Sequence, residues 1–283
     1  ELGTRFIMLT GGEPMMYPEI IPLIRLLSEK NIECLLNTNG ILVLDKIDDL
    51  EGVDIYSISL DGPRELNDYY RGKGVYDKVI KVVEEVRKRG KRVQLQYTMT
   101  RDLKESFRHV DMIAREYGCF IGINFLRPQK QASGKVVGPQ EATQEEILEF
   151  VDWLIEENAC TVPYTRRLLR YVRDWPFDFS RHLIAGKSDL HGFKPIPCAA
   201  GRFMIAIEHQ GNIFPCTKQF FGKPIGNCAD GDIKTAWENL KPIECQACLD
   251  LGCNLLNFNL QFAPSTLLGL ARVLTHKKFK INK

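Results

Sequence analysis

Short apolar runs alternate with amphipathic segments over the first 130 residues of the chain. Five of these runs have the length and composition of β-strands. They are Arg5–Leu9, Glu33–Leu36, Ile55–Leu60, Arg92–Met99 and Phe120–Leu126. Apolar residues at helical spacing predict helices between them at Pro18–Lys30, Tyr76–Arg89 and Glu105–Tyr117. Strands that alternate with helices predict an α/β fold with a parallel sheet, either a barrel or an open sheet.

The ends of the predicted strands carry polar and turn-forming residues. Gly11–Pro14 follows the first strand, Asn39 the second and Ser59–Asp61 the third, while Thr98 and Arg127 lie at the ends of the last two. In parallel α/β folds the carboxyl ends of the strands build the active site. We therefore expect a binding rim at this edge of the sheet.

After residue 130 the pattern becomes mainly helical. Thr143 and Glu146 have the spacing of a capping box, which predicts a helix that runs to about Asn158. A basic helix is expected around Tyr164–Asp174, with its arginines on a solvated face. A short helix is predicted at Asp232–Leu240.

Five of the nine cysteines lie within 56 residues near the C-terminal end. They are Cys198, Cys216, Cys245, Cys248 and Cys253. The first two flank a β-hairpin predicted around Gly211. Cys245 and Cys248 have C-x-x-C spacing, which predicts a tight turn that presents two thiolates to one metal centre. A zinc ion and a 4Fe-4S cluster both use such spacings, so the cysteines alone leave both open.

The composition indicates a globular protein of a reducing compartment, with 44% hydrophobic and 26% charged residues. A net charge of +2 is too small to favour a nucleic-acid partner, and no apolar run is long enough to cross a bilayer. Nine cysteines in a chain of this size do not suit a disulfide scaffold. We expect a cytoplasmic protein in which the other four cysteines are small core residues. These four are Cys34, Cys119, Cys160 and Cys228.

The order of the motifs resembles the radical S-adenosylmethionine (SAM) superfamily. Thr10-Gly11-Gly12-Glu13-Pro14 comes first, then Asn37-Thr38-Asn39-Gly40, and then Ser57-Ile58-Ser59-Leu60-Asp61-Gly62. The cysteine region is similar to the auxiliary-cluster modules of that superfamily, called SPASM or twitch domains. The resemblance extends from Phe6 to Cys253, and its two halves are independent.

The resemblance implies a partial (β/α)6 radical SAM barrel followed by a small C-terminal α+β domain of the twitch or SPASM type. We expect the partial barrel at residues 1–160, without the first strand and cluster loop of the family, and a bridging helical region at 161–196. The auxiliary iron-sulfur domain would occupy residues 197–257, and a tail residues 258–283. The lysines of this tail could touch an acidic membrane surface, but a packed helix with a frayed end is the preferred interpretation.

The resemblance also implies where SAM binds. Glu13 would accept a hydrogen bond from the SAM amino group, with Gly11 and Gly12 allowing close approach of the backbone. Ser59 and Asp61 would contact the ribose or the methionine end. The remaining expected pocket residues are Asn39, Arg71, near the SAM carboxylate, Thr98 and Leu126.

Members of this superfamily hold a catalytic 4Fe-4S cluster on C-x-x-x-C-x-x-C, and that spacing does not occur in this sequence. Because the chain begins at Glu1, we expect that segment to precede it, and we expect no SAM cleavage by the chain as given. No catalytic residue is assigned. The cysteines predict one auxiliary 4Fe-4S cluster, with Cys198, Cys216, Cys245 and Cys248 as the leading ligands and Cys253 as a replacement or a bystander.

Three classes of function remain open on the sequence. The first is a radical SAM oxidoreductase or maturase that generates a 5′-deoxyadenosyl radical and abstracts hydrogen from a small molecule or lipid. The second is a peptide-modifying maturase, and the third is a metal-binding paralogue without catalysis. Either enzyme would need an electron donor such as ferredoxin or flavodoxin.

Overall fold

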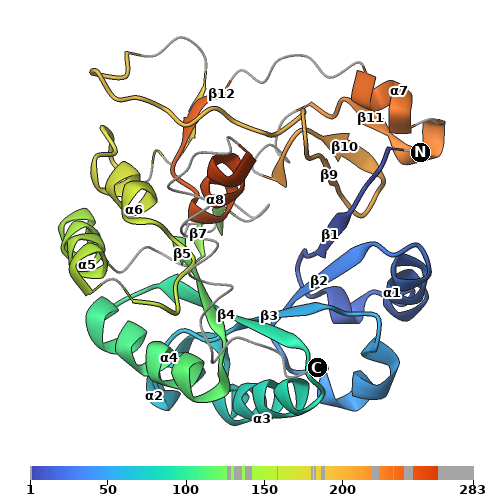
Figure 1. The fold of residues 1–283 in the computed structure, drawn as a ribbon, viewed down its shortest axis with the longest axis horizontal. Coiled ribbons are helices and arrows are strands. Elements are labelled where there is room, and N and C mark those ends of the chain that lie inside the picture. The colour runs from blue at the N-terminus through green and yellow to red at the C-terminus, as the bar shows by residue number, and fades with distance from the viewer. Residues whose placement is uncertain are drawn as a thin grey trace. The chain divides into compact units, whose positions relative to one another are not determined.

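The computed structural model describes residues 2–125, 129–130, 136–137, 142–157, 159–179, 181, 183–185, 189–217, 223–231, 233–238 and 245–260. The described residues divide into two compact units (Figure 1). We call residues 3–173 the sheet unit and residues 174–260 the cysteine unit. Leu126 and the basic tail, for which roles were predicted, lie outside the described residues.

Five parallel strands form the sheet of the sheet unit, and their order in the sheet follows their order in the chain. They are β1 (Phe6–Leu9), β2 (Glu33–Thr38), β3 (Ile55–Ser59), β4 (Arg92–Met99) and β5 (Phe120–Phe125). Each agrees with a predicted strand to within two residues at either end. Parallel neighbours joined by helices in a single winding direction make a partial barrel, as the alternating pattern predicted.

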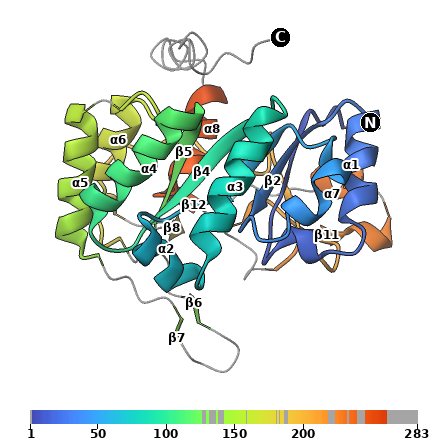
Figure 2. The ribbon, with the colours of Figure 1, turned by 90° about the horizontal axis from the view of Figure 1, so that it is seen from below.

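Helices cover one face of this sheet, as Figures 1 and 2 show. They include α1 (Ile20–Glu29), α3 (Val75–Lys88) and α4 (Leu103–Tyr117). The helical spacing of Val79, Val82, Val83 and Val86 places them on one side of α3, where all four are fully buried. Side chains of β4 alternate between the two faces of the sheet. The buried ones are Val93, Leu95, Tyr97 and Met99. The intervening side chains of β4 therefore lie on the other face.

Three further segments of the sheet unit were not predicted: α2 (Arg64–Arg71), the 3-10 helix η2 (Leu44–Leu50) and the antiparallel pair of β6 (Gln129–Lys130) and β7 (Val136–Val137). A 3-10 turn, η1 (Pro14–Met16), follows β1.

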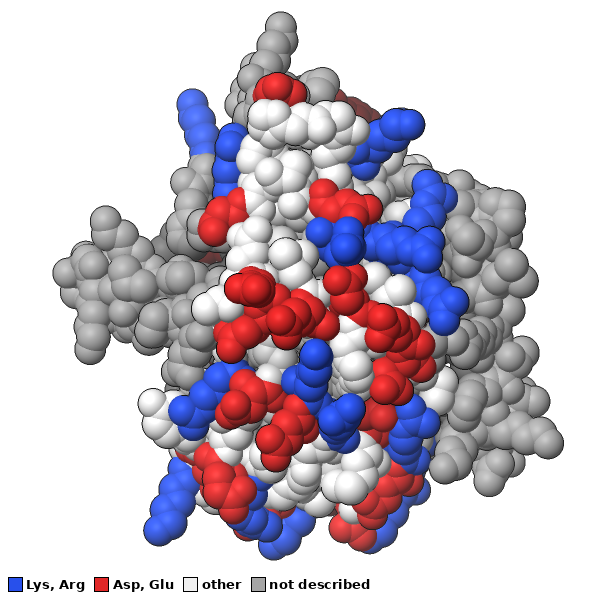
Figure 3. Space-filling model, turned by 90° about the vertical axis from the view of Figure 1, so that its left-hand side faces the viewer, with Lys and Arg blue, Asp and Glu red and all other residues white. Residues whose placement is uncertain are grey.

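The capping box predicted for α5 (Gln144–Glu157) is confirmed. The backbone N–H of Thr143 donates to Glu146 Oε2 at 2.7 Å, and the N–H of Glu146 donates to Thr143 Oγ1 at 3.2 Å. Among the described residues of α5 the charged side chains are all acidic, and those of α6 (Arg166–Arg173) are all basic. Arg173 pairs with Asp152 at 2.9 Å, so the two helices complement each other. Figure 3 shows acidic side chains interspersed with basic ones on the face that is turned to the viewer.

The cysteine unit contains short antiparallel strands. β9 (Ala206–Ile207), β10 (Asn212–Phe214) and β11 (Gly226–Asn227) form one sheet in the order β11-β10-β9. The hairpin predicted around Gly211 is confirmed, because Ile213 pairs with Ile207. Gly211 has φ of 85°, and a Cβ there would lie 2.9 Å from Asn227 Oδ1, so the turn requires glycine.

The C-x-x-C pair lies on a strand, so the prediction of a tight turn was wrong. β12 (Cys245–Cys248) pairs with β8 (Leu183–Ala185), and the register shifts between Cys245 and Ala247. In a regular strand two residues three positions apart point to opposite faces. An irregularity of one residue changes that phase, which lets both cysteines line the same pocket.

Two helices complete the described part of the cysteine unit: α7 (Ile233–Glu238), which agrees with the prediction, and α8 (Leu251–Leu260), which was not predicted. A 3-10 turn, η4 (Cys228–Asp230), lies between β11 and α7. Within the described part of the chain, no helix has the length and apolar character needed to cross a membrane.

Candidate functional site

Glu13 is held rigidly at the carboxyl end of β1. Its Oε1 accepts hydrogen bonds from the Thr38 hydroxyl at 2.7 Å and the Met15 N–H at 3.1 Å. Its Oε2 accepts from the Asn39 N–H at 2.8 Å, so the turn after β1 and the end of β2 share one carboxylate. A carboxylate has about four lone-pair positions, so it can still accept a bond from an ammonium group. Gly11 has φ of 150°, a conformation that favours glycine, and no atom lies within 4 Å of a Cβ built there.

Asp61 and Arg71 form a buried, two-pronged ion pair beyond the end of β3. Arg71 Nε donates to Asp61 Oδ2 at 2.6 Å, and Arg71 Nη2 donates to Oδ1 at 3.0 Å. The N–H of Thr98 also donates to Oδ1, at 3.1 Å. The side chain of Asp61 is 3% exposed and that of Arg71 is 23% exposed. The Asp61 carboxylate is thus hydrogen-bonded within the protein, whereas part of the Arg71 side chain remains exposed to solvent.

Three other predicted SAM-pocket residues, Asn39, Ser59 and Thr98, lie at the carboxyl ends of β2, β3 and β4. Ser59 is the last residue of β3, and Thr98 lies opposite Asn124 in the register of β4 and β5; Ser59 and Thr98 are both half-buried. Asn39 uses its side chain to accept from the N–H of Ile41 at 2.9 Å. The structure therefore places these predicted residues at or next to the carboxyl ends of neighbouring strands.

A ladder of uncharged polar side chains, which was not predicted from the sequence, crosses the face of the sheet opposite to α1, α3 and α4. Gln94 Nε2 donates to Gln96 Oε1 at 2.8 Å, and the Ser57 hydroxyl donates to the same oxygen at 3.4 Å. Gly122 lies opposite Gln96 on β5, and its lack of a side chain makes room for both glutamines. The sequence did carry a signal for this ladder. Gln94 and Gln96 are two positions apart on one strand, so both side chains lie on the face opposite to the helices.

Replacing Gly122 by alanine should destabilise the sheet unit by about 1 kcal/mol, the lower end of the range for overpacking, because the new Cβ meets the ends of two flexible side chains. The new Cβ would lie 2.3 Å from Gln94 Nε2 and 2.6 Å from Gln96 Oε1, so the ladder would have to rearrange. Gly12→Ala is the matched control, because nothing lies within 4 Å of a Cβ at that position. Urea unfolding measures the stability of both variants. Equal unfolding midpoints would show that the glutamine side chains rearrange without loss of stability.

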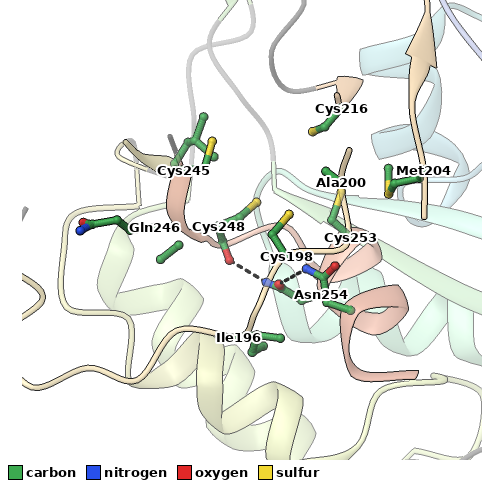
Figure 4. Close-up of a pocket in the computed structure, with 13 residues that line it drawn as sticks. Ile196, Cys198, Ala200, Met204, Cys216, Cys245, Gln246, Cys248, Cys253 and Asn254 are labelled. Atoms are coloured by element: carbon green, nitrogen blue, oxygen red, sulfur yellow. Dashed lines mark hydrogen bonds between the residues drawn. The ribbon is translucent and has the colours of Figure 1, made fainter. Parts of the chain in front are cut away.

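Five cysteines line one pocket of the cysteine unit, as Figure 4 shows. Their thiols point toward a shared space, and apolar side chains such as Ile196 and Met204 complete the lining. These five are the predicted ligands Cys198, Cys216, Cys245, Cys248 and Cys253. Among the described residues no group of three or more His, Cys, Asp or Glu side chains is arranged around a single ion position.

The contacts of these thiols suit a metal centre. Cys253 hydrogen-bonds to Cys216, and this bond together with burial raises the pKa of the Cys253 thiol. Bound metal requires thiolates and reverses that preference by supplying positive charge. The N–H of Asp250 donates to Cys248 Sγ at 3.4 Å, and Asp250 Oδ1 accepts from the N–H of Cys253 at 2.8 Å. A donor aimed at sulfur stabilises a thiolate and tunes an attached cluster.

Two of the remaining cysteines behave as the sequence analysis expected. Cys34 and Cys119 are fully buried, and burial raises their thiol pKa values to about 11 and about 12 respectively. A nearby Asp54 adds to the shift of Cys34. Neutral, buried thiols of this kind are inert core residues. Cys160 and Cys228 are half-buried, and neither lines the pocket of Figure 4.

The fold and the site together define an α/β partial-barrel protein with a cysteine-rich C-terminal unit. The model of the radical SAM superfamily matches residues 1–116, so this part of the chain is similar to that superfamily.

Two named relatives match most of the chain. The AdoMet-dependent heme synthase of Oleidesulfovibrio alaskensis is 27% identical over 84% of this chain and 63% of its own length. Mycofactocin maturase MftC of Mycolicibacterium smegmatis is 25% identical over 83% of this chain and 58% of its own. The chain thus spans less than two thirds of the length of both relatives.

Two solved structures share the fold. Streptococcus suis SuiB superposes with a TM-score of 0.60 at 17% identity, over 84% of this chain and 56% of that one. The anSMEcpe structure with bound AdoMet and Kp18Cys peptide gives a TM-score of 0.55 at 15% identity, over 94% and 85%. They confirm the predicted fold class, a partial α/β barrel followed by a small C-terminal domain.

Proposed function

We propose that the chain belongs to a radical SAM enzyme that binds SAM at the carboxyl edge of the sheet and one auxiliary 4Fe-4S cluster in the cysteine unit. The observation that carries the proposal is a fixed Glu13 carboxylate after β1 and an Asp61–Arg71 ion pair after β3, both inside the segment that matches the superfamily. When bound, SAM and a reduced catalytic cluster supply a carbon-centred radical for hydrogen abstraction; the protein binds, orients and shields.

Charge complementarity assigns roles in SAM binding. Glu13 accepts from the ammonium group, and the exposed part of Arg71 faces the carboxylate of the same amino-acid moiety. Asp61 holds the guanidinium in one orientation. The hydroxyls of Ser59 and Thr98 are left to bind the polar groups of the nucleoside. Gly11 and Gly12 leave open space next to Glu13, where the amino-acid part of SAM would bind.

The cysteine pocket fits an iron-sulfur cluster by its donor set. Four thiolates are needed, and five line the pocket. A space surrounded by thiols suits a cluster of several irons, whereas zinc needs all four sulfurs about 2.3 Å from one point. We keep Cys198, Cys216, Cys245 and Cys248 as the ligand set, with Cys253 as the competitor because it contacts Cys216.

The substrate is proposed to be a small organic molecule or a peptide. The relatives carry the names of a heme synthase and of a mycofactocin maturase, and they match similar shares of this chain. A one-electron donor such as ferredoxin or flavodoxin would be required, in a reducing compartment such as the cytoplasm.

Glu13→Gln should weaken SAM binding by about tenfold to one hundredfold. The variant removes a charge-assisted hydrogen bond worth about 1.5–3 kcal/mol while keeping the size of the side chain. Equilibrium dialysis of the chain against labelled SAM measures this change. Glu33→Gln is the control, because Glu33 is the first residue of β2 and pairs with Arg92 at the end of the strand opposite to Thr38. Equal affinity of the wild-type chain and Glu13→Gln would contradict the proposed site.

A further inference from the structure

Two buried asparagines of α8 connect the two halves of the cysteine pocket. Asn254 Nδ2 donates to the backbone oxygen of Cys248 at 2.6 Å, and Asn257 Nδ2 donates to Asn254 Oδ1 at 3.2 Å. Asn257 Oδ1 in turn accepts from the N–H of Ala199 at 2.8 Å. We call Asn254 and Asn257 with these three bonds the asparagine relay.

The relay begins and ends beside candidate cluster ligands. Ala199 follows Cys198 directly, and the relay ends on the carbonyl group of Cys248 itself. Asn254 and Asn257 lie three positions apart on α8, so they share a face of the helix. Cys253 also belongs to α8, so this helix links three of the five thiol-bearing positions. Figure 4 shows Asn254 next to Cys198 and Cys248, with its hydrogen bonds drawn as dashes.

Burial makes the relay specific. Asn254 is 1% exposed and Asn257 is 3% exposed, so water cannot replace a lost partner. Unpaired amide groups at such positions are costly, which favours the one arrangement that satisfies both side chains. All three bonds point the same way, from the Ala199 N–H to the Cys248 carbonyl, and aligned bonds reinforce one another. The relay also carries no net charge and no proton that titrates near neutral pH.

We propose that Asn254 and Asn257 are positioning residues of the auxiliary cluster. They fix the spacing between the Cys198 segment and the C-x-x-C strand, so that both thiolates stay in place when the cluster changes its charge. The inference rests on the proposed function, since it assigns the relay to that cluster. Asn257 ties the pocket together through its side chain.

Aspartate substitutions break one relay bond at a time. Asn254→Asp can still accept from Asn257 but cannot donate to the Cys248 carbonyl. Asn257→Asp can still accept from Ala199 but cannot donate to Asn254. Each also places a negative charge beside the cluster. Asn257→Ser makes a smaller change without charge and serves where an aspartate prevents folding, which circular dichroism of the iron-free chain reports.

Asn227→Asp is the matched control. Asn227 also bridges two backbone segments of the cysteine unit, since its Nδ2 donates to Gln210 O at 3.0 Å and to Asn212 Oδ1 at 2.9 Å. It does not line the pocket. A general weakening of the cysteine unit would therefore appear in this variant too.

The experiment loads each chain anaerobically with iron and sulfide. It then measures iron loss to a chelator, the electron paramagnetic resonance spectrum of the reduced cluster and the midpoint potential. Relay variants should lose iron several-fold faster than the wild-type chain, give an altered spectrum and, for the aspartates, a more negative potential. Asn227→Asp should match the wild type in all three.

Two outcomes overturn the inference, and they differ. A wild-type chain that holds iron, with relay variants equal to it in all three measurements, shows that the relay serves the fold alone. A wild-type chain that binds no iron removes the proposed function, and the inference with it.

Discussion

Cys248→Ala is expected to abolish the auxiliary cluster. Two contacts support Cys248, because the Asp250 N–H donates to its sulfur and Asn254 Nδ2 donates to its carbonyl oxygen. The variant removes one of the four preferred ligands of a cluster that takes four, so it should hold less than half of the wild-type iron if Cys253 does not replace the lost thiolate. Iron quantitation and visible absorption after anaerobic loading measure the loss.

Cys228→Ala is the control for this loss, since Cys228 lies in η4 and outside the pocket lining. Full iron in Cys248→Ala would contradict the assignment of the C-x-x-C strand. The same series separates Cys245 from Cys253 as the fourth ligand. Loss of iron in Cys245→Ala with retention in Cys253→Ala supports the preferred set, and the reverse result replaces Cys245 by Cys253.

Arg71→Met is expected to destabilise the sheet unit by about 3 kcal/mol, the lower end of the range for removing one partner of a buried pair. The variant leaves the Asp61 carboxylate 3% exposed and without its two-pronged partner. The estimate is at the lower end because the Arg71 side chain is itself 23% exposed. Such a loss would be a large fraction of the total stability of a domain, about 5–15 kcal/mol. SAM affinity should fall in the same variant.

Arg64→Met provides the matched control in the same helix. Arg64 pairs with Asp77, but their side chains are 50% and 51% exposed, and exposed pairs contribute at most about 1 kcal/mol. Urea unfolding of both variants gives the comparison. Equal losses of stability would mean that the Asp61–Arg71 pair behaves as a surface pair and does not organise the site.

The sheet was predictable because its signal is local. β4 was predicted with both boundaries correct, since Val93, Leu95, Tyr97 and Met99 alternate with polar residues and bury one face. α2 was missed for the opposite reason. Of its eight residues only Leu66 and Asn67 are buried, so it carries no apolar period. The strand character of Cys245–Cys248 depends on pairing with β8, more than 50 residues earlier, which no local pattern reports.

Site residues could be predicted where a sequence motif marks them. Contacts between residues that are distant in the sequence could not be predicted. Gly-Gly-Glu-Pro after a strand identified Glu13, but the engagement of Asp61 by Arg71 depends on the path of α2. The five cysteines were found from spacing alone, and the structure places all five around one pocket. Asn254 and Asn257 gave no signal of a relay, because asparagine is common on surfaces and only the structure shows their burial.

Anaerobic quantitation of iron, sulfide and zinc on the loaded wild-type chain is the decisive experiment for the cysteine pocket. We expect about four irons and four sulfides per chain with no zinc, as one 4Fe-4S cluster requires. About eight irons would mean that a second cluster has ligands not assigned above. One zinc without sulfide would contradict the account, because the pocket would then be a structural zinc site without a redox role.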